Sequence, residues 1–454
     1  MIYKLPHMPS PALKSTPSTQ SVQKGQQKEL QQSVMNSEST RVDEQEGKDA
    51  MIENLVQEIE ARMNASENQP VPENSVDVDT LYQKAENLIQ ELGIDKGAAP
   101  RHVRATRLYC YARMKIAQGQ PGAKELLFQA VKLHPRRAGV WNCLAELLWR
   151  DGDLKQAHDC LLSSLEQSPD KVTLRNLSML LRKLEGSAKE KADHMSESII
   201  RAKEAVALDI NDAESWYVLA NAYMAMFFAM SHDHRDLESA LKAYYRSENL
   251  ETGRNNPDLF YNRAQVLAFM EHFSSAIADY ERADMLDRSL GAGALAKSLR
   301  EQVKSTAMHI DSKGRIKPKR LATLRASLEE YIAQPGHEQI SVCDLDEGPN
   351  TNINIHVKVL MGISASGSPV STFLALDYKG NIFALSIFHL DETTQSRLGS
   401  AKENISISDP LLRTTILDNH RYQSIQVQHP AHVSLNGRQL HSAFAHASMA
   451  TSTI

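Results

Sequence analysis

Apolar residues recur every three or four positions from Met51 to about Ile332, with short breaks at glycine and proline, and this spacing predicts α-helices. After Ala333–Gln339 the period changes to two. The segments "NINIHVKVLMGI", "FLALDYKGNIFALSIF", "YQSIQV" and "HVSLNGRQL" alternate apolar and polar residues, which predicts about five β-strands. Tight hairpin turns are expected at Lys379-Gly380 and Asn436-Gly437. We therefore predict an all-α body followed by a small all-β domain.

The first 50 residues follow neither pattern. They are rich in Ser, Gln and Pro and poor in aromatic residues. Such a segment buries too little apolar surface to offset the conformational entropy lost on folding, so we expect it to be disordered. The predicted domains are a disordered head at 1–50, a helical region at 51–335 and a β domain at 336–454.

The helical region carries an internal repeat. Each copy starts with a bulky residue, followed at offsets 3, 4 and 7 by mostly apolar, small and apolar residues. Copies start at Trp141, Leu174, Trp216 and Phe260, and a half-copy lies at Ala123–Pro135. The first and last of these four copies also have similar residues at offsets 16, 20 and 23, whereas offset 28 is Pro169 in the first copy and Arg288 in the last. This pattern resembles the tetratricopeptide repeat (TPR), a helix–turn–helix unit of about 34 residues.

The residue types of the repeat indicate how its units pack. Small residues let paired helices approach closely, and one unit cannot bury its apolar face alone, so units stack into an α–α superhelix with a concave channel. Such a solenoid is a binding module. The region contains no nucleophile–base pair, glycine-rich phosphate loop or metal-ligand spacing, so we expect no enzymatic activity, cofactor or metal site.

Two segments depart from the repeat length. About eight extra residues, including "SHDHRD", lie between Tyr223 and Ala240, and the segment 182–200 is also long. His232 and His234 suggest a metal, but we interpret this stretch as a solvated loop.

Composition and charge narrow the function class. The chain is 41% hydrophobic and 24% charged with a net charge of −5, so any nucleic-acid contact must be local. Its four cysteines contain no Cys-x-x-Cys pair and are expected to be free, buried thiols. No segment has the roughly 20 apolar residues of a membrane span, and the N-terminus has no secretory signal. We expect a cytoplasmic and nuclear protein without a membrane partner.

In TPR proteins the first helix of each unit lines the channel. The family's lining positions, applied to the copies above, select polar residues that can hold a peptide backbone and its charged side chains. An arginine suits a carboxylate and an aspartate suits a cation, so the channel predicts a short peptide with adjacent opposite charges. The predicted peptide-binding residues are Arg175, Asn176, Arg182, Asn221, Asp258, Asn262 and Gln265, with Tyr217 and Tyr261 on the same wall.

A local positive patch follows the repeats. The segment "DSKGRIKPKRLATLRASL" has no acidic residue from Ser312 to Leu328 and can contact RNA phosphates, act as a nuclear localisation signal, or be a solvated linker. The predicted RNA-contacting residues are Lys313, Arg315, Lys317, Lys319 and Arg320.

The β domain suits a small barrel of the OB type. Such barrels often stack nucleic-acid bases on aromatic side chains. Here the aromatic residues are few and several alternate into a predicted core, so we favour a docking barrel over a single-strand binder. These residues are Phe373, Tyr378, Phe383, Phe388 and Tyr422.

The blocks "WNCLAELLWRDGDLKQAH", "NLSMLLRKL", "NNPDLFYNRA", "DSKGRIKPKRL" and "VSLNGRQ", in this order, resemble the tetratricopeptide repeat protein 5 (Strap) family from about residue 80 to 445. The resemblance implies a TPR solenoid followed by an OB-fold domain. It also implies an adaptor that binds the nascent N-terminus of tubulin, Met-Arg-Glu, at the ribosome and triggers tubulin mRNA decay through an mRNA-decay adaptor. Arg182 and Asp258 resemble the family's peptide-binding positions, and Lys317 and Lys319 its ribosome-contacting lysines.

The family also implies an alternative role, a nuclear stress-responsive scaffold that bridges a histone acetyltransferase co-activator and transcription factors. One departure concerns the channel. The family has an acidic channel residue shortly after the "LDP" that closes the last repeat, whereas this chain reads "LDRSLGAGA" there. The affinity or register of the peptide is therefore expected to differ.

Overall fold

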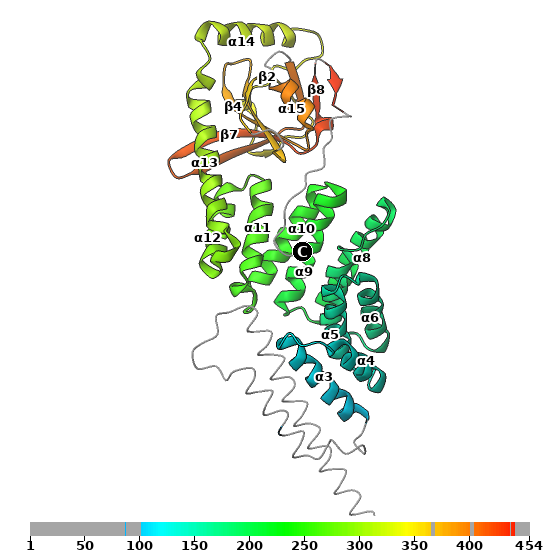
Figure 1. Cartoon of the computed structure of the whole chain (residues 1–454). Coiled ribbons are helices and arrows are strands. Elements are labelled where there is room, and N and C mark those ends of the chain that lie inside the picture. Colours follow the sequence, from blue (N-terminus) through cyan, green and yellow to red (C-terminus); the bar gives the residue numbers. More distant parts are fainter. Residues whose placement is uncertain (1–86, 88–100, 365–367, 400–403, 436, 441–454) are drawn as a thin grey trace, which may run out of the picture. The chain divides into compact units, whose positions relative to one another are not determined.

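The computed structural model describes residue 87 and residues 101–364, 368–399, 404–435 and 437–440 (Figure 1). The predicted disordered head at 1–50, and the helices expected before residue 101 other than at residue 87, lie outside the described residues. The chain forms two compact units, 1–144 and 145–454, which are described separately. No helix in the described ranges is both long and apolar enough to cross a membrane.

In the first unit, α3 (Arg101–Ala117) packs against α4 (Ala123–Leu133). Leu127 and Ala130 of the predicted half-copy are fully buried, as the repeat requires. Helix α5 (Ala138–Arg150) begins in this unit, and the indole Nε1 of Trp141 donates to the carbonyl of Pro135 at 2.7 Å. The second unit repeats this contact, because Trp216 Nε1 donates to the carbonyl of Ile210 at 2.9 Å. The repeat in the sequence therefore corresponds to a repeated contact in the structure.

The second unit contains the remaining repeats. Their helices are α6 (Leu154–Gln167), α7 (Lys171–Leu181), α8 (Ala188–Leu208), α9 (Ala213–Met226), α10 (His234–Glu248), α11 (Pro257–Phe269) and α12 (Phe273–Leu286). Asp153, Asp170, Asp212 and Asn256 cap the N-termini of α6, α7, α9 and α11. A side-chain oxygen that accepts from a first-turn amide sets where each helix begins.

Small residues lie at the helix contacts, as predicted. Ala157, Ser178, Ala220 and Ala264 are at most 2% exposed, and bulky neighbours fill the space around them. Helix α13 (Ala292–Asp311) packs on α12 and continues the apolar core. The predicted TPR solenoid followed by a small β domain is confirmed.

The tail forms one curled, nine-stranded sheet within the described residues (Figure 1). The order is β1-β6-β7-β4-β3-β2-β5-β8-β9, antiparallel except for the β4–β7 pair. The segments expected to form about five strands contain β2, β3, β4, β7, β8 and β9, whereas β1, β5 and β6 were not predicted. The strands are β1 (Gly348–Pro349), β2 (Asn354–Gly362), β3 (Val370–Leu376), β4 (Ile382–Phe388), β5 (Asn404–Ser408), β6 (Leu411–Leu417), β7 (His420–Val427), β8 (Val433–Leu435) and β9 (Arg438–Gln439), with the short helix α15 (Glu392–Leu398) between β4 and β5.

Both expected hairpins form at the predicted positions. Gly380 has φ of 93° between β3 and β4, and Gly437 has φ of 81° between β8 and β9. Glycine adopts this left-handed backbone at little steric cost, which explains the turns. Asn436 lies outside the described residues.

The sheet is buried on both faces. Its concave side encloses an aliphatic core that includes Ile355, Phe373 and Ile425. The outer side of β2, β3 and β4 packs against α14 (Pro318–Ile332) through Leu324 and Leu374, among others. Elsewhere Phe388 of β4 joins the core of the solenoid. Polar residues of these strands, such as Ser371 of β3 and Ser386 of β4, are buried as well.

The exposure of the aromatic and cysteine side chains tests two predictions, one on base stacking and one on buried thiols. Phe373, Phe383, Phe388 and Tyr422 are buried and Tyr378 is half-buried, so the first four offer no exposed stacking surface. Three cysteines are buried and free, as expected, but the free Cys343 is exposed.

The interpretation of the extra segment as a solvated loop is wrong. A π-helical turn, η1 (Phe227–Ser231), leads into α10, and His232 is only 8% exposed. The ring of His234 packs edge-to-face against Phe388 of the β domain at 5.4 Å. Burial lowers the pKa of His234 to about 4. No group of metal-ligating residues was found in the ranges described. The insertion packs the solenoid against the sheet.

Candidate functional site

Three successive first helices, α7, α9 and α11, carry six of the seven predicted peptide-binding residues, and Arg182 is the C-cap of α7. The structure joins α9 and α11 through a buried polar network. The Asn262 amide Nδ2 donates to the Tyr217 hydroxyl at 3.2 Å and to Asn221 Oδ1 at 3.3 Å. Tyr244 of α10 donates to the same Asn221 oxygen at 2.5 Å.

This network fixes the orientation of its amides. Asn221 is 3% exposed and Asn262 is fully buried. Asn262 Oδ1 is buried and accepts no hydrogen bond from the described residues. An unsatisfied buried carbonyl costs about 1–3 kcal/mol, and a donor supplied by a ligand would remove that cost.

Arg182 is a buried cation without a carboxylate. The residue is 8% exposed, its Nη1 reaches only the Val218 carbonyl at 3.4 Å, and its Nε has no partner among the described residues. Burial lowers its pKa to about 10, and the nearby charges that favour the cation come from Tyr217 and Tyr244. A desolvated guanidinium with free donors favours a carboxylate or another oxygen-rich ligand.

Arg263 shows what a satisfied buried arginine looks like in the same fold. It is 3% exposed and holds Asp279 with two bonds of 2.6 and 2.8 Å and Glu248 with one of 2.6 Å. Burial opposes its charge, but these carboxylates raise its pKa above the usual range. The fold can therefore neutralise a buried guanidinium, but no carboxylate in the described ranges does so at Arg182.

Negative charge borders the same network. Burial raises the pKa of Tyr217, and the charges of Asp258 and Glu214 raise it further, whereas Arg182 lowers it. Asp258 lies in the first turn of α11 and Glu214 in the first turn of α9. Charges of both signs therefore act on Tyr217.

The other predicted channel residues have different surroundings. Arg175 forms an ion pair with Asp212 at 2.5 Å, which ties α7 to the capped end of α9. Asn176 is half-buried and its Nδ2 has no partner in the described part of the chain. Gln265 is 6% exposed.

Two residues of the site were missed in the sequence. Tyr244 lies on a second helix, which channel-lining rules ignore. Glu214, by contrast, stands two residues before Trp216, as Asp258 stands two residues before Phe260. Repeat alignment therefore could have found it.

The predicted ribosome-contacting residues form an exposed basic segment. Lys313, Arg315, Lys317, Lys319 and Arg320 are all exposed, and none forms an ion pair with a described residue. The last three, with Thr323 and Leu324, line a shallow hollow at the start of α14.

The backbone of this segment packs against the sheet, although its basic side chains are exposed. The interpretation of the segment as a solvated linker is therefore wrong. Lys313, Gly314 and Arg315 have φ of 52°, 61° and 54° in the turn η4 (Lys313–Arg315). A Cβ on Gly314 would lie 3.0 Å from atoms of Leu374 and of Met361. The side chains of Lys313 and Arg315 therefore extend from a backbone that packing holds in place.

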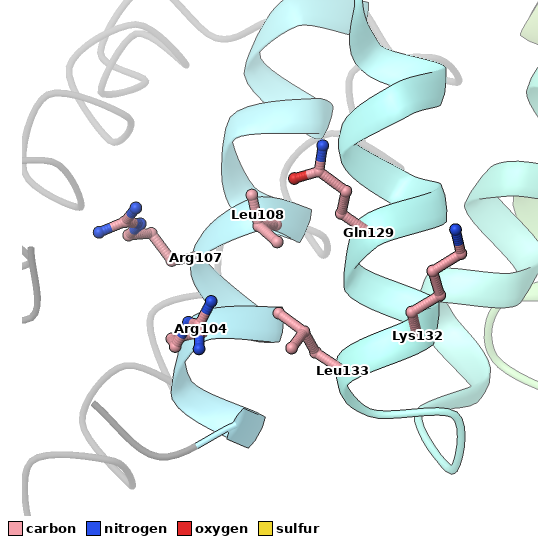
Figure 2. A pocket seen from close by; sticks show the side chains of 6 residues that line it. All are labelled: Arg104, Arg107, Leu108, Gln129, Lys132 and Leu133. Atoms are coloured by element: carbon pink, nitrogen blue, oxygen red, sulfur yellow. The ribbon is translucent and has the colours of Figure 1, made fainter. Parts of the chain in front are cut away.

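The first unit has a second basic surface, which was not predicted from the sequence. Residues 101–144 contain nine Lys or Arg residues and one acid, Glu125. Each of α3 and α4 contributes three residues at offsets 0, 3 and 4 to a hollow (Figure 2). They are Arg104, Arg107, Leu108, Gln129, Lys132 and Leu133.

Comparisons with known proteins agree with this architecture. Residues 336–449 match a family model described as the tetratricopeptide repeat protein 5 OB fold domain. Tetratricopeptide repeat protein 5 of Homo sapiens is 30% identical over 339 residues, 70% of this chain and 76% of that protein. The Bos taurus protein of the same name is 28% identical over 379 residues, 79% of this chain and 86% of that protein.

Among solved structures, YrrB, described as a TPR protein with an unusual peptide-binding site, is 18% identical with a TM-score of 0.32 and covers 48% of this chain and 97% of its own. The structure titled "Functional Characterization of Pseudomonas Aeruginosa pilF" is 18% identical with a TM-score of 0.37, covering 48% of this chain and 95% of its own. The repeats, the OB-fold match and the similarity to the human protein together show that the chain belongs to the tetratricopeptide repeat protein 5 family.

Proposed function

We propose that this protein is a non-enzymatic adaptor whose channel binds the nascent N-terminus of tubulin at the ribosome and thereby triggers tubulin mRNA decay. The observation that carries the proposal is Arg182, a buried guanidinium that pairs with no carboxylate of the described residues. A peptide that begins Met-Arg-Glu supplies a carboxylate for Arg182 and a cation for Asp258. The amides of Asn221 and Asn262 belong to the polar network that joins α9 and α11, and amide groups suit a peptide backbone.

Fluorescence anisotropy of a labelled Met-Arg-Glu peptide with the full chain tests the channel. Arg182→Ala is expected to weaken binding by at least about 30-fold, because a desolvated charge pair is worth about 2–5 kcal/mol. Asp258→Ala is expected to weaken it as well. Arg201→Ala is the matched control, since Arg201 pairs with Glu197 and Glu204 on the second helix of its repeat. Unchanged affinity in Arg182→Ala would refute the channel assignment.

The exposed basic segment supplies the contact with ribosomal RNA in this proposal. Each phosphate that a lysine neutralises releases about one counterion, so binding weakens as salt rises. The double variant Lys317→Glu/Lys319→Glu is expected to co-sediment less with ribosomes. The slope of its binding constant against salt concentration should fall by the amount expected for about two lost phosphate contacts. Lys189→Glu, an exposed lysine at the start of α8, is the control. Equal co-sedimentation of all variants would count against this surface.

The second candidate function is the nuclear co-activator scaffold. It is supported by the OB-fold sheet, whose buried aromatic residues favour docking over base stacking. It predicts nuclear enrichment after stress that depends on residues 313–320. Imaging of the wild type and of Lys317→Glu with Lys319→Glu distinguishes it, because unchanged distribution would contradict an import role for the segment.

A further inference from the structure

The hollow at the start of α14 contains a hydroxyl as well as three cations. It is lined by Lys317, Lys319, Arg320, Thr323 and Leu324. Thr323 is exposed, and its Oγ1 donates to the carbonyl of Lys319 at 3.0 Å within the same helix. Lys319 and Arg320 lie four and three residues before Thr323, so their side chains share its face of the helix. The hydroxyl therefore lies among cations on the surface.

No negative charge of the surrounding segment balances these cations. Residues 312–328 contain no acidic residue, and Lys317, Lys319 and Arg320 form no ion pair with a described residue. The first turn of α14 contains no acid and no side chain that caps it. Cations at the positive end of a helix dipole are unfavourably placed, and an anion beside them removes that cost. A negative group on Thr323 would supply this anion.

An arginine three residues before Thr323 matches the charge pattern that basophilic protein kinases select in their substrates. In the described ranges this arginine precedes three hydroxyl residues, Ser178, Ser424 and Thr323. Ser178 is fully buried and Ser424 is 2% exposed, so neither can enter a kinase active site. Thr323 is exposed and is therefore the accessible acceptor of this pattern in the part of the chain that the structure describes.

The start of α14 can open to a kinase, which binds its substrate as an extended segment. This end of the helix lacks a capping side chain, and Pro318 at its first position has no amide hydrogen. Its contacts with the sheet come from Leu321 and Leu324, which are half-buried. Helix ends with few stabilising contacts open locally at a low free-energy cost.

We propose that Thr323 is a phosphorylation site for a basophilic kinase, and that its phosphate occupies the hollow in place of a ribosomal RNA phosphate. Thr323 Oγ1 attacks the γ-phosphorus of ATP, the bond to the β,γ-bridging oxygen breaks, ADP leaves, and the hydroxyl proton passes to the catalytic carboxylate of the kinase. The product carries about two negative charges beside Lys319 and Arg320. The effect on RNA binding rests on the proposed function, whereas the modification itself does not.

Phosphorylation of the full chain by calcium/calmodulin-dependent protein kinase II, with ATP and magnesium, tests the site. Peptide mass spectrometry is expected to locate a phosphate on Thr323, and Thr323→Val should remove that phosphate. Arg320→Gln should slow its addition, because the kinase loses its basic contact. An unmodified Thr323, under conditions in which a standard peptide substrate is fully phosphorylated, would overturn the proposal.

Phosphorus NMR of the phosphorylated chain tests whether the phosphate lies in the hollow. The second pKa of a free phosphothreonine is about 6, and neighbouring cations should lower it. Lys319→Gln is expected to return this pKa towards the free value. A second pKa that Lys319→Gln leaves unchanged would contradict occupancy of the hollow.

Co-sedimentation with ribosomes measures the consequence. Phosphorylated wild type and Thr323→Glu are expected to bind at least about tenfold more weakly than unmodified wild type at about 0.15 M salt, because about two phosphate contacts are lost. Ser196→Glu is the matched control. Ser196 is an exposed residue of α8 whose Oγ also donates to the carbonyl four residues earlier, at 2.9 Å, but no cation lies three or four residues before it.

The outcomes separate this inference from the proposed function. Equal binding of phosphorylated and unmodified wild type would overturn the effect of the phosphate on RNA binding. Failure of unmodified wild type to co-sediment would instead refute the proposed ribosome contact, and phosphorylation of Thr323 would still be decided by mass spectrometry.

Discussion

Single residues decide whether a buried charge stabilises this fold or serves a ligand. Arg182 and Arg263 are both under 10% exposed, but only Arg263 has carboxylate partners. Removing one member of a satisfied buried ion pair leaves an uncompensated charge, whereas removing an unpaired buried charge leaves none. The same chemical change should therefore have opposite effects at the two positions.

We predict that Arg182→Met leaves the unfolding free energy unchanged or raises it by about 1 kcal/mol, while abolishing peptide capture. Arg263→Met should cost about 3–5 kcal/mol, because Asp279 is left buried and unpaired. Urea denaturation of the two variants measures both effects. A loss of more than about 2 kcal/mol in Arg182→Met would show that this arginine supports the fold rather than a ligand.

At the scale of elements, the turn η4 positions the basic segment. Three consecutive residues with positive φ are costly for side chains other than glycine, so the surrounding packing must hold them in place. Gly314 lies against Leu374 and Met361, and Leu321 and Leu324 of α14 pack against the same strands.

Gly314→Ala is expected to destabilise the protein by about 2 kcal/mol and to weaken ribosome binding, because the added Cβ meets the sheet at 3.0 Å. Gly336→Ala is the matched control. Its φ of +91° also lies in a range that L side chains rarely adopt, but its Cβ meets no atom within 4 Å. Chemical denaturation should show the smaller cost at Gly336. Equal costs in the two variants would mean that contact with the sheet contributes nothing.

At the scale of the second unit, a buried polar junction joins the solenoid to the sheet. Glu271 accepts from Ser386 at 2.5 Å and from Gln426 at 2.7 Å, and burial raises its pKa. Arg413 Nη1 lies 2.9 Å from His272 Nδ1. A guanidinium only donates, so this nitrogen accepts and the imidazole is neutral. Burial, with Arg413 adding to it, lowers the pKa of His272 to about 4.

The junction predicts acid sensitivity. His234 and His272 have pKa values of about 4 in the folded protein, below the ordinary value of about 6.5. Between these values the unfolded chain binds more protons, so the unfolding free energy falls as pH falls. We expect a loss of about 1–2 kcal/mol for each imidazole between pH 7 and pH 4.5.

Melting temperatures across this pH range test the prediction. His234→Phe keeps the ring packed against Phe388 but cannot titrate, so it should flatten the pH dependence. His420→Gln, at the β6–β7 hairpin, serves as the control. A pH profile of His234→Phe identical to that of wild type would contradict a role for His234 in acid sensitivity.

The sequence by itself determined the class of fold, because the fold class depends on local periodicity, and the same periodicity predicts the channel positions. A repeat of bulky and small residues specifies helix pairs whichever residues surround them, and glycine pairs specify the hairpins. The same periodicity selects Arg182 and Asp258. It also contained Glu214, at the position equivalent to Asp258.

Only the tertiary structure decided how each charge is used, because the free energy of a buried charge depends on partners distant in sequence. It pairs Arg175 with Asp212 and Arg263 with Asp279, and it gives Arg182 no carboxylate from the part of the chain that it describes. It likewise turned "SHDHRD" from an expected loop into packing against the sheet, since a histidine's environment comes from residues more than 150 positions away, such as Phe388.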